Sequence, residues 1–209
     1  MPESLIVIGG GEHAHVVIDA ARAQPDRFVI VGIVDPSPST AFDFGVPWLG
    51  DDRTAAAGLT GEARIVLGLG GPPALRQKVA AAWATHSWRW TTVVHPRASV
   101  SPSAQLEGGA VVLANAVVNA CAHVGAHAIV NSGAIVEHHV VLGPFVHVAP
   151  RAVLGGGAKV GAATHVGLGA TVRDHVEIGE RTVVGMAAAV TRSFAGDVTL
   201  IGVPARVRN

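Results

Sequence analysis

A strict six-residue repeat runs through the second half of this chain. When the chain is written as hexads from Val94, all 17 first positions up to Val190 are Val, Leu or Ile. The fifth positions from Ala98 to Ala188 are all Ala, Val or Thr, and the last one is Phe194. A period of six does not fit a helix of 3.6 residues per turn. It fits a parallel β-helix, in which each flat face takes one hexad and turns one aliphatic and one small side chain inward.

The repeat accounts for an unusual composition. The chain of 209 residues is 49% hydrophobic but only 4% aromatic. Val and Ala suit narrow interior layers in which a large ring does not fit. The 17 hexads make between five and six coils of three faces each. We expect the register to hold without a slip to Phe194, which would close the stack.

Residues 1 to 92 follow a different pattern, in which strands and helices alternate. Apolar runs at 5–8, 28–34 and 64–67 predict buried strands, and the segments 15–23 and 74–83 suit helices. This alternation predicts a Rossmann-like α/β domain with a small parallel sheet, whose ligands bind at the carboxyl ends of the strands. We therefore expect an α/β domain over 1–92 and a β-helix domain over 93–209.

Charge and hydropathy argue against several classes of partner. The 15 Lys and Arg residues balance 15 Asp and Glu residues, so no basic surface for nucleic acid is expected. Gly, Pro, His or a charged residue interrupts every apolar stretch before the roughly 20 residues that a membrane span needs. The N-terminus lacks the features of a signal peptide, and the single Cys121 can form no internal disulfide. Both predict a cytoplasmic protein.

Several motifs resemble those of sugar acetyltransferases that carry an N-terminal nucleotide-sugar domain. They are the segments 9–14, 94–96, 131–138, 145–147 and 202–206. This group contains the 4-amino-sugar N-acetyltransferases of the PglD type and the sialic acid O-acetyltransferases of the NeuD type. The resemblance implies a left-handed β-helix, acetyl-CoA as co-substrate, a nucleotide-sugar substrate and no metal. It also implies a homotrimer with active sites between its subunits.

The resemblance also implies roles for individual residues. His138 corresponds to the general base, and Glu137 precedes it. His147 falls in the region of the acetyl-CoA thioester, and Gly156 falls where a backbone N–H approaches the thioester carbonyl. Leu168 and Met186 would flank the pantetheine arm of CoA. The residues implied in nucleotide-sugar binding are Gly10, Gly11, Glu12, His13, Asp35 and Gly68.

Two positions depart from the family pattern. Glu12 precedes His13 where the family usually has a small residue and Gly, and His139 stands where an acid usually follows the catalytic His. Acetyl transfer to an amine needs a base for the released proton and donors for the thioester oxyanion. Because side chains alternate along a strand, we expect either that Glu137 orients the His138 ring around a turn or that the base is tuned more weakly here.

Taken without the resemblance, some of these signals are weak. Residues 9–11 let phosphate approach a helix N-terminus, but they lack the full dinucleotide fingerprint, and Glu12 would repel phosphate. Asp35 before Pro36 also suits a turn. His165, one coil after His147, fits a simple stack of histidines.

The leading interpretation is an acetyl-CoA-dependent N-acetyltransferase of a nucleotide-linked amino sugar, such as a 4-amino-4,6-dideoxyhexose. O-acetylation of sialic acid or another sugar hydroxyl is the closest alternative. A hydroxyl must be activated by the base, so O-transfer should suffer more than N-transfer from having His139 in place of the usual acid. A zinc enzyme would need a further ligand near His139 and His175, which share a column two coils apart. A non-catalytic β-helix scaffold is the remaining alternative, and it gives His138 no role.

Overall fold

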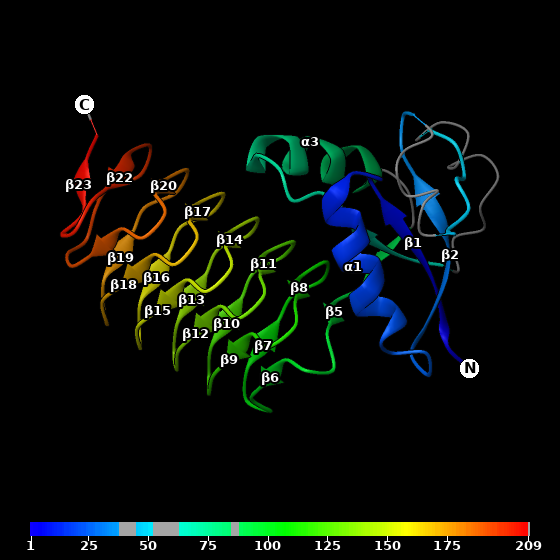
Figure 1. Ribbon diagram of the computed structural model, residues 1–209, viewed down its shortest axis with the longest axis horizontal. Helices are drawn as coiled ribbons and strands as arrows, with labels where there is room; N and C mark the ends of the chain where they lie inside the picture. Colours follow the sequence, from blue (N-terminus) through cyan, green and yellow to red (C-terminus); the bar gives the residue numbers. More distant parts are fainter. Residues whose placement is uncertain (38–44, 52–62, 85–87, 209) are drawn as a thin grey trace. The chain divides into compact units, whose positions relative to one another are not determined.

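The computed structural model describes residues 1–37, 45–51, 63–84 and 88–208. It divides into two compact units, Met1–Pro96 and Arg97–Asn209, and each is described by itself (Figure 1). The sequence placed the corresponding boundary between residues 92 and 93.

The first unit contains a parallel four-stranded sheet with the order β2-β1-β3-β4. Its strands are β1 (Glu3–Ile8), β2 (Phe28–Val34), β3 (Arg64–Leu67) and β4 (Arg89–Trp90), and β5 (Val93–Val94) follows near the end of the unit. The helices are α1 (Glu12–Arg22) and α3 (Pro73–Ala84). The predicted α/β fold is therefore confirmed, and the predicted strands at 28–34 and 64–67 have the observed bounds.

The helices of this unit begin earlier than the sequence predicted. Helix α1 begins at Glu12, three residues before the expected start, because a carboxylate in the first turn interacts favourably with the helix dipole. Helix α3 begins at Pro73, whose fixed φ suits a first helical position. Both helices therefore start directly beside the loops that follow β1 and β3.

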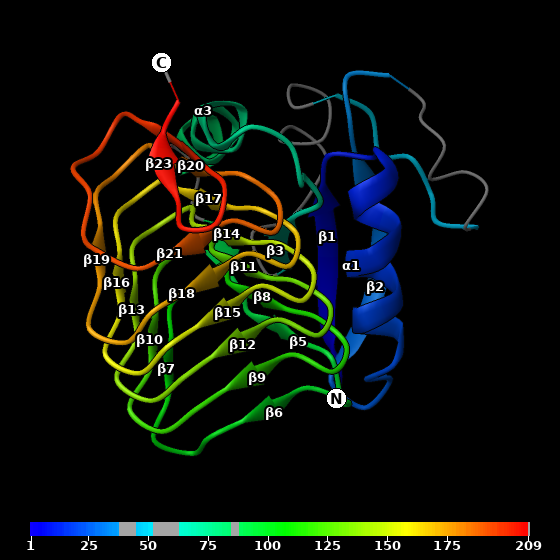
Figure 2. The ribbon, with the colours of Figure 1, turned by 60° about the vertical axis from the view of Figure 1, so that its left-hand side comes forward.

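The second unit is a parallel β-helix whose short strands pair 18 residues apart, as Val118, Val136 and Leu154 do. Three sheets follow the faces of the coils (Figure 2). The first contains β6 (Ser99–Val100), β9 (Val117–Val118), β12 (Ile135–Val136), β15 (Val153–Leu154), β18 (Thr171–Val172) and β21 (Ala189–Val190). The second contains β7 (Gln105–Leu106), β10 (His123–Val124), β13 (Val141–Leu142), β16 (Lys159–Val160) and β19 (Glu177–Ile178). The third contains β8 (Val111–Val112), β11 (Ile129–Val130), β14 (His147–Val148), β17 (His165–Val166), β20 (Val183–Val184), β22 (Thr199–Ile201) and the antiparallel β23 (Arg206–Val207).

The hexad phase decides which side chains point inward. From Ala110 to Val190, every first-position and every fifth-position side chain is buried. From Gly109 to Ala187, every fourth-position residue has a positive φ. Each hexad therefore ends its flat face at a corner in the left-handed conformation, which Gly and Asn, Asp or His tolerate best. The predicted β-helix is confirmed, and the left-handed conformation of the fourth hexad position is a feature that the repeat did not predict.

Glycine recurs at the second hexad position because neighbouring coils approach closely there. A Cβ on Gly143 would lie 2.7 Å from the backbone N of Ala162 in the next coil. A Cβ on Gly161 or Gly179 would meet the backbone of the following coil as closely. These contacts are below the separation of ordinary van der Waals pairs, so a side chain at these positions would push the coils apart.

The expected register is wrong in its last hexad. The sequence placed Phe194 at an inward fifth position, but the structure pairs it with Ile178, which occupies a first position. The pairing of Val184 with Leu200 shows the same spacing of 16 residues. The chain takes a tighter corner after Val190, so the final turn is two residues shorter than the others.

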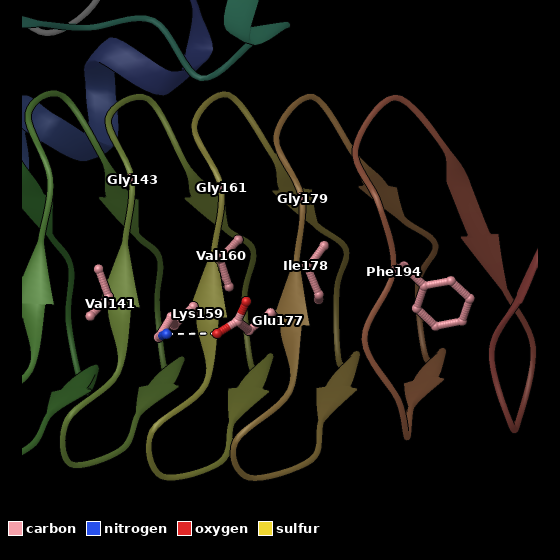
Figure 3. A pocket seen from close by; sticks show the side chains of 9 residues that line it. All are labelled: Val141, Gly143, Lys159, Val160, Gly161, Glu177, Ile178, Gly179 and Phe194. Atoms are coloured by element: carbon pink, nitrogen blue, oxygen red, sulfur yellow. Dashed lines mark hydrogen bonds and ion pairs between the residues drawn. The ribbon is translucent and has the colours of Figure 1, made fainter.

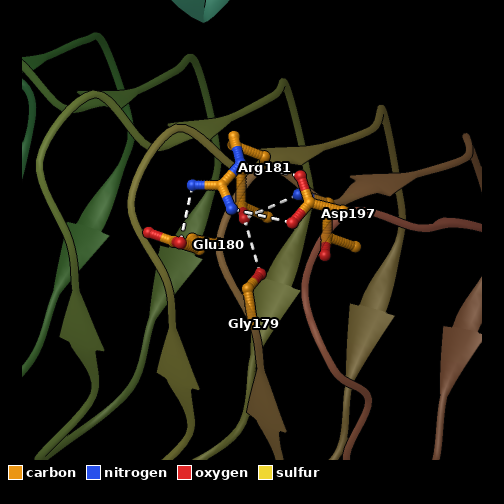
Figure 4. Close-up of polar contacts among 6 residues, drawn as sticks. Gly179, Glu180, Arg181 and Asp197 are labelled. Atoms are coloured by element: carbon orange, nitrogen blue, oxygen red, sulfur yellow. Dashed lines mark hydrogen bonds and ion pairs between the residues drawn. The ribbon is translucent and has the colours of Figure 1, made fainter.

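An ion-pair network fastens this shortened turn. The Arg181 guanidinium donates two hydrogen bonds of 2.7 Å to the Asp197 carboxylate and contacts Glu180 at 2.6 Å (Figure 4). These hydrogen bonds hold the pKa of Asp197 below its usual value. Because the groups are exposed, solvent screens the network, and it acts mainly by fixing the geometry of the last corner.

No helix in the described part of the chain has the length and apolar character needed to cross a membrane.

Candidate functional site

His138 lies on the corner between β12 and β13, where the chain leaves the first sheet. Its exposed ring occupies the space above Gly156 in the next coil, because a Cβ at Gly156 would lie 2.6 Å from both Cε1 and Nε2 of His138. Among the described residues, the N–H of Gly156 donates no hydrogen bond within the chain. The corner thus combines an imidazole with a neighbouring free N–H, which suits a base beside an oxyanion donor.

Glu137 lies on the same corner but does not direct its carboxylate to the His138 ring. Its Oε2 accepts hydrogen bonds from the main-chain N–H of His138 at 3.2 Å and from Nδ2 of Asn119 at 3.1 Å. The Oδ1 atom of Asn119 accepts from the N–H of Ala120, which fixes the orientation of the amide. Glu137 therefore braces the backbone of the corner, while the His138 ring contacts His139.

His147 lies on β14, on a different face from the corner of His138. It is 8% exposed, and its Nε2 lies 3.1 Å from Nδ2 of Asn131. Since the N–H of Ser132 binds Oδ1 of Asn131, the amide presents its NH₂ group to the ring, and Nε2 of His147 is the acceptor. The ring also packs edge-on against His165, with centroids 4.9 Å apart. The neutral Nδ1–H tautomer of His147 follows from this arrangement.

The sequence indicated no role for Asn119, and it included Asn131 only as the first residue of the segment 131–138. Both occupy the second hexad position, where a Gly or Ala is common in this chain. Each binds the following N–H with its own Oδ1 and turns its NH₂ group to a predicted site residue of the next coil. A polar side chain at this position, 18 or 16 residues before a predicted functional residue, was the available signal.

Leu168 and Met186 lie on a third part of the β-helix, the corner that follows β17 and β20. They are 53% and 77% exposed, and the N–H of Ala187 donates to the carbonyl of Leu168, so they occupy successive coils. The structure therefore brings Glu137, His138 and Gly156 together but places His147, Leu168 and Met186 elsewhere on the same chain.

The second sheet carries a shallow groove of about 410 Å³ on its outer face (Figure 3). The ion pair between Lys159 and Glu177 crosses the groove at 2.6 Å, and Phe194 lines its end. None of the predicted site residues lines it. The groove is thus separate from the chemistry expected at His138.

In the first unit, the loops after β1, β2 and β3 meet at the carboxyl ends of the strands, as a parallel sheet predicts. The Asp35 carboxylate accepts the N–H of Gly10 at 2.8 Å and the N–H of Ser37 at 3.0 Å. A Cβ on Gly68 would lie 2.5 Å from the carbonyl oxygen of Gly9. Asp35 and Gly68 therefore hold the loop that leads to Gly11, the exposed N-cap of α1.

Glu12 and His13 open helix α1 beside this loop. Glu12 is exposed, whereas the His13 ring packs so closely on Gly70 that a Cβ there would lie 2.7 Å from it. Burial, with a further contribution from the charge of Arg76, lowers the pKa of His13 to about 4. Arg76 is 1% exposed, and burial lowers its pKa to about 10. Neutral His13 is therefore a hydrogen-bonding group at this end of the sheet, and Arg76 is a buried cation that the sequence did not predict.

Within the part of the chain that the structure describes, no three His, Cys, Asp or Glu side chains gather in a way that could hold a metal ion.

A parallel β-helix with a histidine held over a glycine corner, in one chain with a parallel α/β unit, defines a β-helical acyltransferase with an N-terminal ligand-binding unit. The PglD N-terminal domain family matches residues 4–82. Comparison with the curated proteins gave no match.

Solved structures match the whole chain. PerB from Caulobacter crescentus, in complex with CoA and GDP-perosamine, is 37% identical, with 99% of this chain and 97% of that chain covered and a TM-score of 0.90. A His-to-Asn variant of perosamine N-acetyltransferase from the same organism, in complex with the same two ligands, is 36% identical over the same shares, with a TM-score of 0.89. The acetyltransferase domain of PglB from Neisseria gonorrhoeae, in complex with acetyl-CoA, is 30% identical over 100% of both chains, with a TM-score of 0.93. The chain belongs to this family of β-helical sugar acetyltransferases, and the predicted resemblance is confirmed.

Proposed function

We propose that the protein transfers the acetyl group of acetyl-CoA to the amino group of a nucleotide-linked 4-amino-4,6-dideoxyhexose, with GDP-perosamine as the first substrate to test. The full-length similarity to an enzyme in complex with CoA and GDP-perosamine carries the proposal. The corner of His138 supports it, because a base and a free backbone N–H lie side by side there.

His138 is the proposed general base. The neutral amine attacks the thioester carbonyl carbon and forms the C–N bond, and Nε2 of His138 takes the proton that the nitrogen releases. The N–H of Gly156 donates to the oxyanion of the tetrahedral intermediate. Collapse breaks the C–S bond, and the thiolate takes the proton from Nε2 of His138 and leaves as CoA, so the base is restored. The products are the sugar amide and free CoA.

The first unit is the proposed nucleotide-sugar site. The loop of Gly10 and Gly11 lies at the N-terminus of α1, whose helix dipole favours a diphosphate. Neutral His13 adds a hydrogen-bonding group, and Asp35 and Gly68 shape the loop from the neighbouring strands. Glu12 stays at the rim, where it contacts sugar hydroxyls rather than phosphate.

A homotrimer with shared active sites is a further part of the proposal. His138 lies on one corner of the β-helix, His147 lies on a different face, and Leu168 and Met186 lie on another corner. One chain cannot turn these positions towards one CoA molecule, whereas a neighbouring copy can bring its exposed Leu168 and Met186 beside His138. The pantetheine arm would then lie between two chains and cover these apolar side chains.

A thiol-release assay with acetyl-CoA tests the activity. We expect turnover with GDP-perosamine, weaker turnover with UDP- or dTDP-linked 4-amino sugars, and an acetylated amine by mass spectrometry. His138→Asn should lower kcat on the order of 100-fold or more, whereas His123→Asn, at a partly exposed histidine paired with Glu107, should not. Acetylation of sialic acid instead would favour O-transfer, and loss of activity with a chelator would favour a metalloenzyme. Ligand binding with no turnover on any amino sugar would favour a scaffold.

Subunit mixing tests the shared site. A His138→Asn chain and a Leu168→Asp/Met186→Asp chain should each be nearly inactive alone. If the site combines both corners from different chains, random mixed trimers should regain about a quarter of the wild-type sites. No recovery in trimers shown to be mixed would contradict a shared site.

A cytoplasmic location is also part of the proposal, and the free thiol of Cys121 suits a reducing compartment.

A further inference from the structure

His139 stands where the family usually has an acid, and the structure gives this residue a direct contact with the base. Nδ1 of His139 lies 3.1 Å from Nδ1 of His138, and the two rings stand edge-on at 84°. In a pair of neutral rings one nitrogen donates and the other accepts. We propose that His139 is a positioning residue whose Nδ1 accepts the proton of His138 Nδ1–H, so that the lone pair of the base stands on Nε2. This inference rests on the proposed function.

The backbone explains how adjacent side chains can meet. Along a strand they would point to opposite sides, but His139 has a φ of 58°, which ends the alternation at the corner. Its N–H donates to the carbonyl of Ala120 in the preceding coil at 3.0 Å, so the turn is held in place. Asn, Asp and His tolerate this left-handed conformation best among residues with a side chain. An imidazole can therefore replace a carboxylate here without backbone strain.

The surroundings of the pair favour Nε2 as the reacting atom. The Nε2 edge of His138 faces Gly156, where a Cβ would lie 2.6 Å away, and the Nδ1 edge faces His139. A proton fixed on Nδ1 keeps Nε2 ready to accept one beside the N–H of Gly156. With the opposite tautomer, Nε2 would carry a proton and could take none from the amine.

The Glu137 carboxylate is bound by other groups, so His139 is the hydrogen-bond partner of the His138 ring. The Glu137 carboxylate is bound by Asn119 and by the main chain of His138. The coil before this corner contributes Cys121, and the coil after it contributes Gly157. Asp174 and His175 follow one coil further on, at the corner beyond 155–157. A neutral imidazole orients His138 without the negative charge that a carboxylate would place beside the imidazolium form.

Three substitutions at residue 139 separate the effect of a hydrogen-bond acceptor from the effect of a negative charge. His139→Gly keeps the left-handed backbone and removes the acceptor, so kcat should fall on the order of 10- to 100-fold, while KM for both substrates stays within about twofold. His139→Asn restores an acceptor through Oδ1 and should keep kcat within a few-fold of wild type. His139→Asp should also keep kcat, and its carboxylate should move the acid limb of the pH–rate profile upward by about one pH unit.

His127→Gly is the matched control. His127 is also a fourth-position histidine, with a φ of 57°, but it lies on another corner and stacks on Phe145. The control should lower the melting temperature without changing kcat. Wild-type kcat in His139→Gly, or a His139→Asn variant as slow as His139→Gly, would overturn the positioning role.

A second measurement does not depend on turnover. ¹⁵N NMR of the imidazole nitrogens, at a pH where both rings are neutral, should show the His138 proton on Nδ1 in wild type and on either nitrogen in His139→Gly. A wild-type proton on Nε2 would overturn the inference. If wild type transfers no acetyl group to any amino sugar, the proposed function fails, and the tautomer of His138 still decides whether His139 positions its ring.

Discussion

The two units of this chain differ in how directly a residue's position follows from the sequence around it. In the β-helix, partners such as Val136 and Leu154 are related by one fixed spacing, so the hexad phase of a residue places its side chain inward, outward or at a corner. In the α/β unit, the contact of Asp35 with Gly10 joins two loops 25 residues apart that no repeat relates. In the repeat, the hexad phase of a residue is enough to place its side chain. In the α/β unit, the placement of a side chain depends on contacts between segments that are far apart in the sequence.

The largest test of this comparison is a change of phase in the β-helix. Deletion of Ala163 alone moves every later hexad by one position and takes the aliphatic side chains off the inner face. Deletion of residues 163–180 removes a whole coil and joins Ala162 to Arg181, which then takes the place of Ala163, and both Ala163 and Arg181 have positive φ in the native chain. We expect the single deletion to abolish folding of the later coils and the 18-residue deletion to leave a folded protein with a melting temperature a few degrees lower.

Circular dichroism and thermal unfolding measure the difference between these two deletions. The deletion of Ala163 alone should lose the β-sheet signal of the later coils, although it removes far fewer residues than the deletion of 163–180. Equal damage from both deletions would show that the coils depend on specific residues rather than on phase.

A smaller test compares two leucines at different hexad phases. Leu154 is fully buried at a first position, so Leu154→Ala should lower the free energy of unfolding by about 4 kcal/mol through lost burial and a cavity. Leu168 is exposed at a third position, so the same substitution should cost less than about 0.5 kcal/mol. Leu168→Ala should instead raise KM for acetyl-CoA several-fold. Chemical denaturation and initial rates give both readouts, and similar stability losses would contradict the assignment of phase.

The same contrast explains how much of the molecule could be predicted from its sequence. The β-helix, its inward columns and the α/β alternation follow from apolar periodicity, and the structure confirms them. The slip before Phe194 was missed because the residues after Val190 still fit the pattern by composition, although the backbone takes a shorter corner. His138 could be singled out only by resemblance, because spacing alone does not separate it from other corner histidines.

The contacts around the candidate site depend on backbone geometry that no motif encodes. The meeting of His138 with His139 requires the left-handed corner, and the role of Asn119 requires knowing which atoms of its amide are already bound. In the α/β unit, Arg76 lies on a helix of ordinary composition, and only the packing of the unit buries it.

The test with the smallest expected effect lies in the α/β unit, where burial lowers the pKa of His13. The pKa of His13 falls from an ordinary 6.5 to about 4 in the folded chain, mainly through burial and also through the charge of Arg76. Below pH 6.5 the unfolded chain binds a proton that the folded chain does not, so stability is lost as the pH falls and levels off below about pH 4. The total loss from this group is about 3 kcal/mol.

His13→Gln removes the titrating group and should flatten this part of the stability profile, whatever constant change the substitution adds. Arg76→Met removes the charge but keeps an apolar side chain of similar length, so it should reduce the acid-side loss without abolishing it, because burial is the larger cause. Urea unfolding between pH 4 and pH 7 measures how steeply the free energy of unfolding of each variant changes with pH. A His13→Gln protein that loses stability as steeply as wild type would show that His13 is not the group in the α/β unit whose burial opposes protonation.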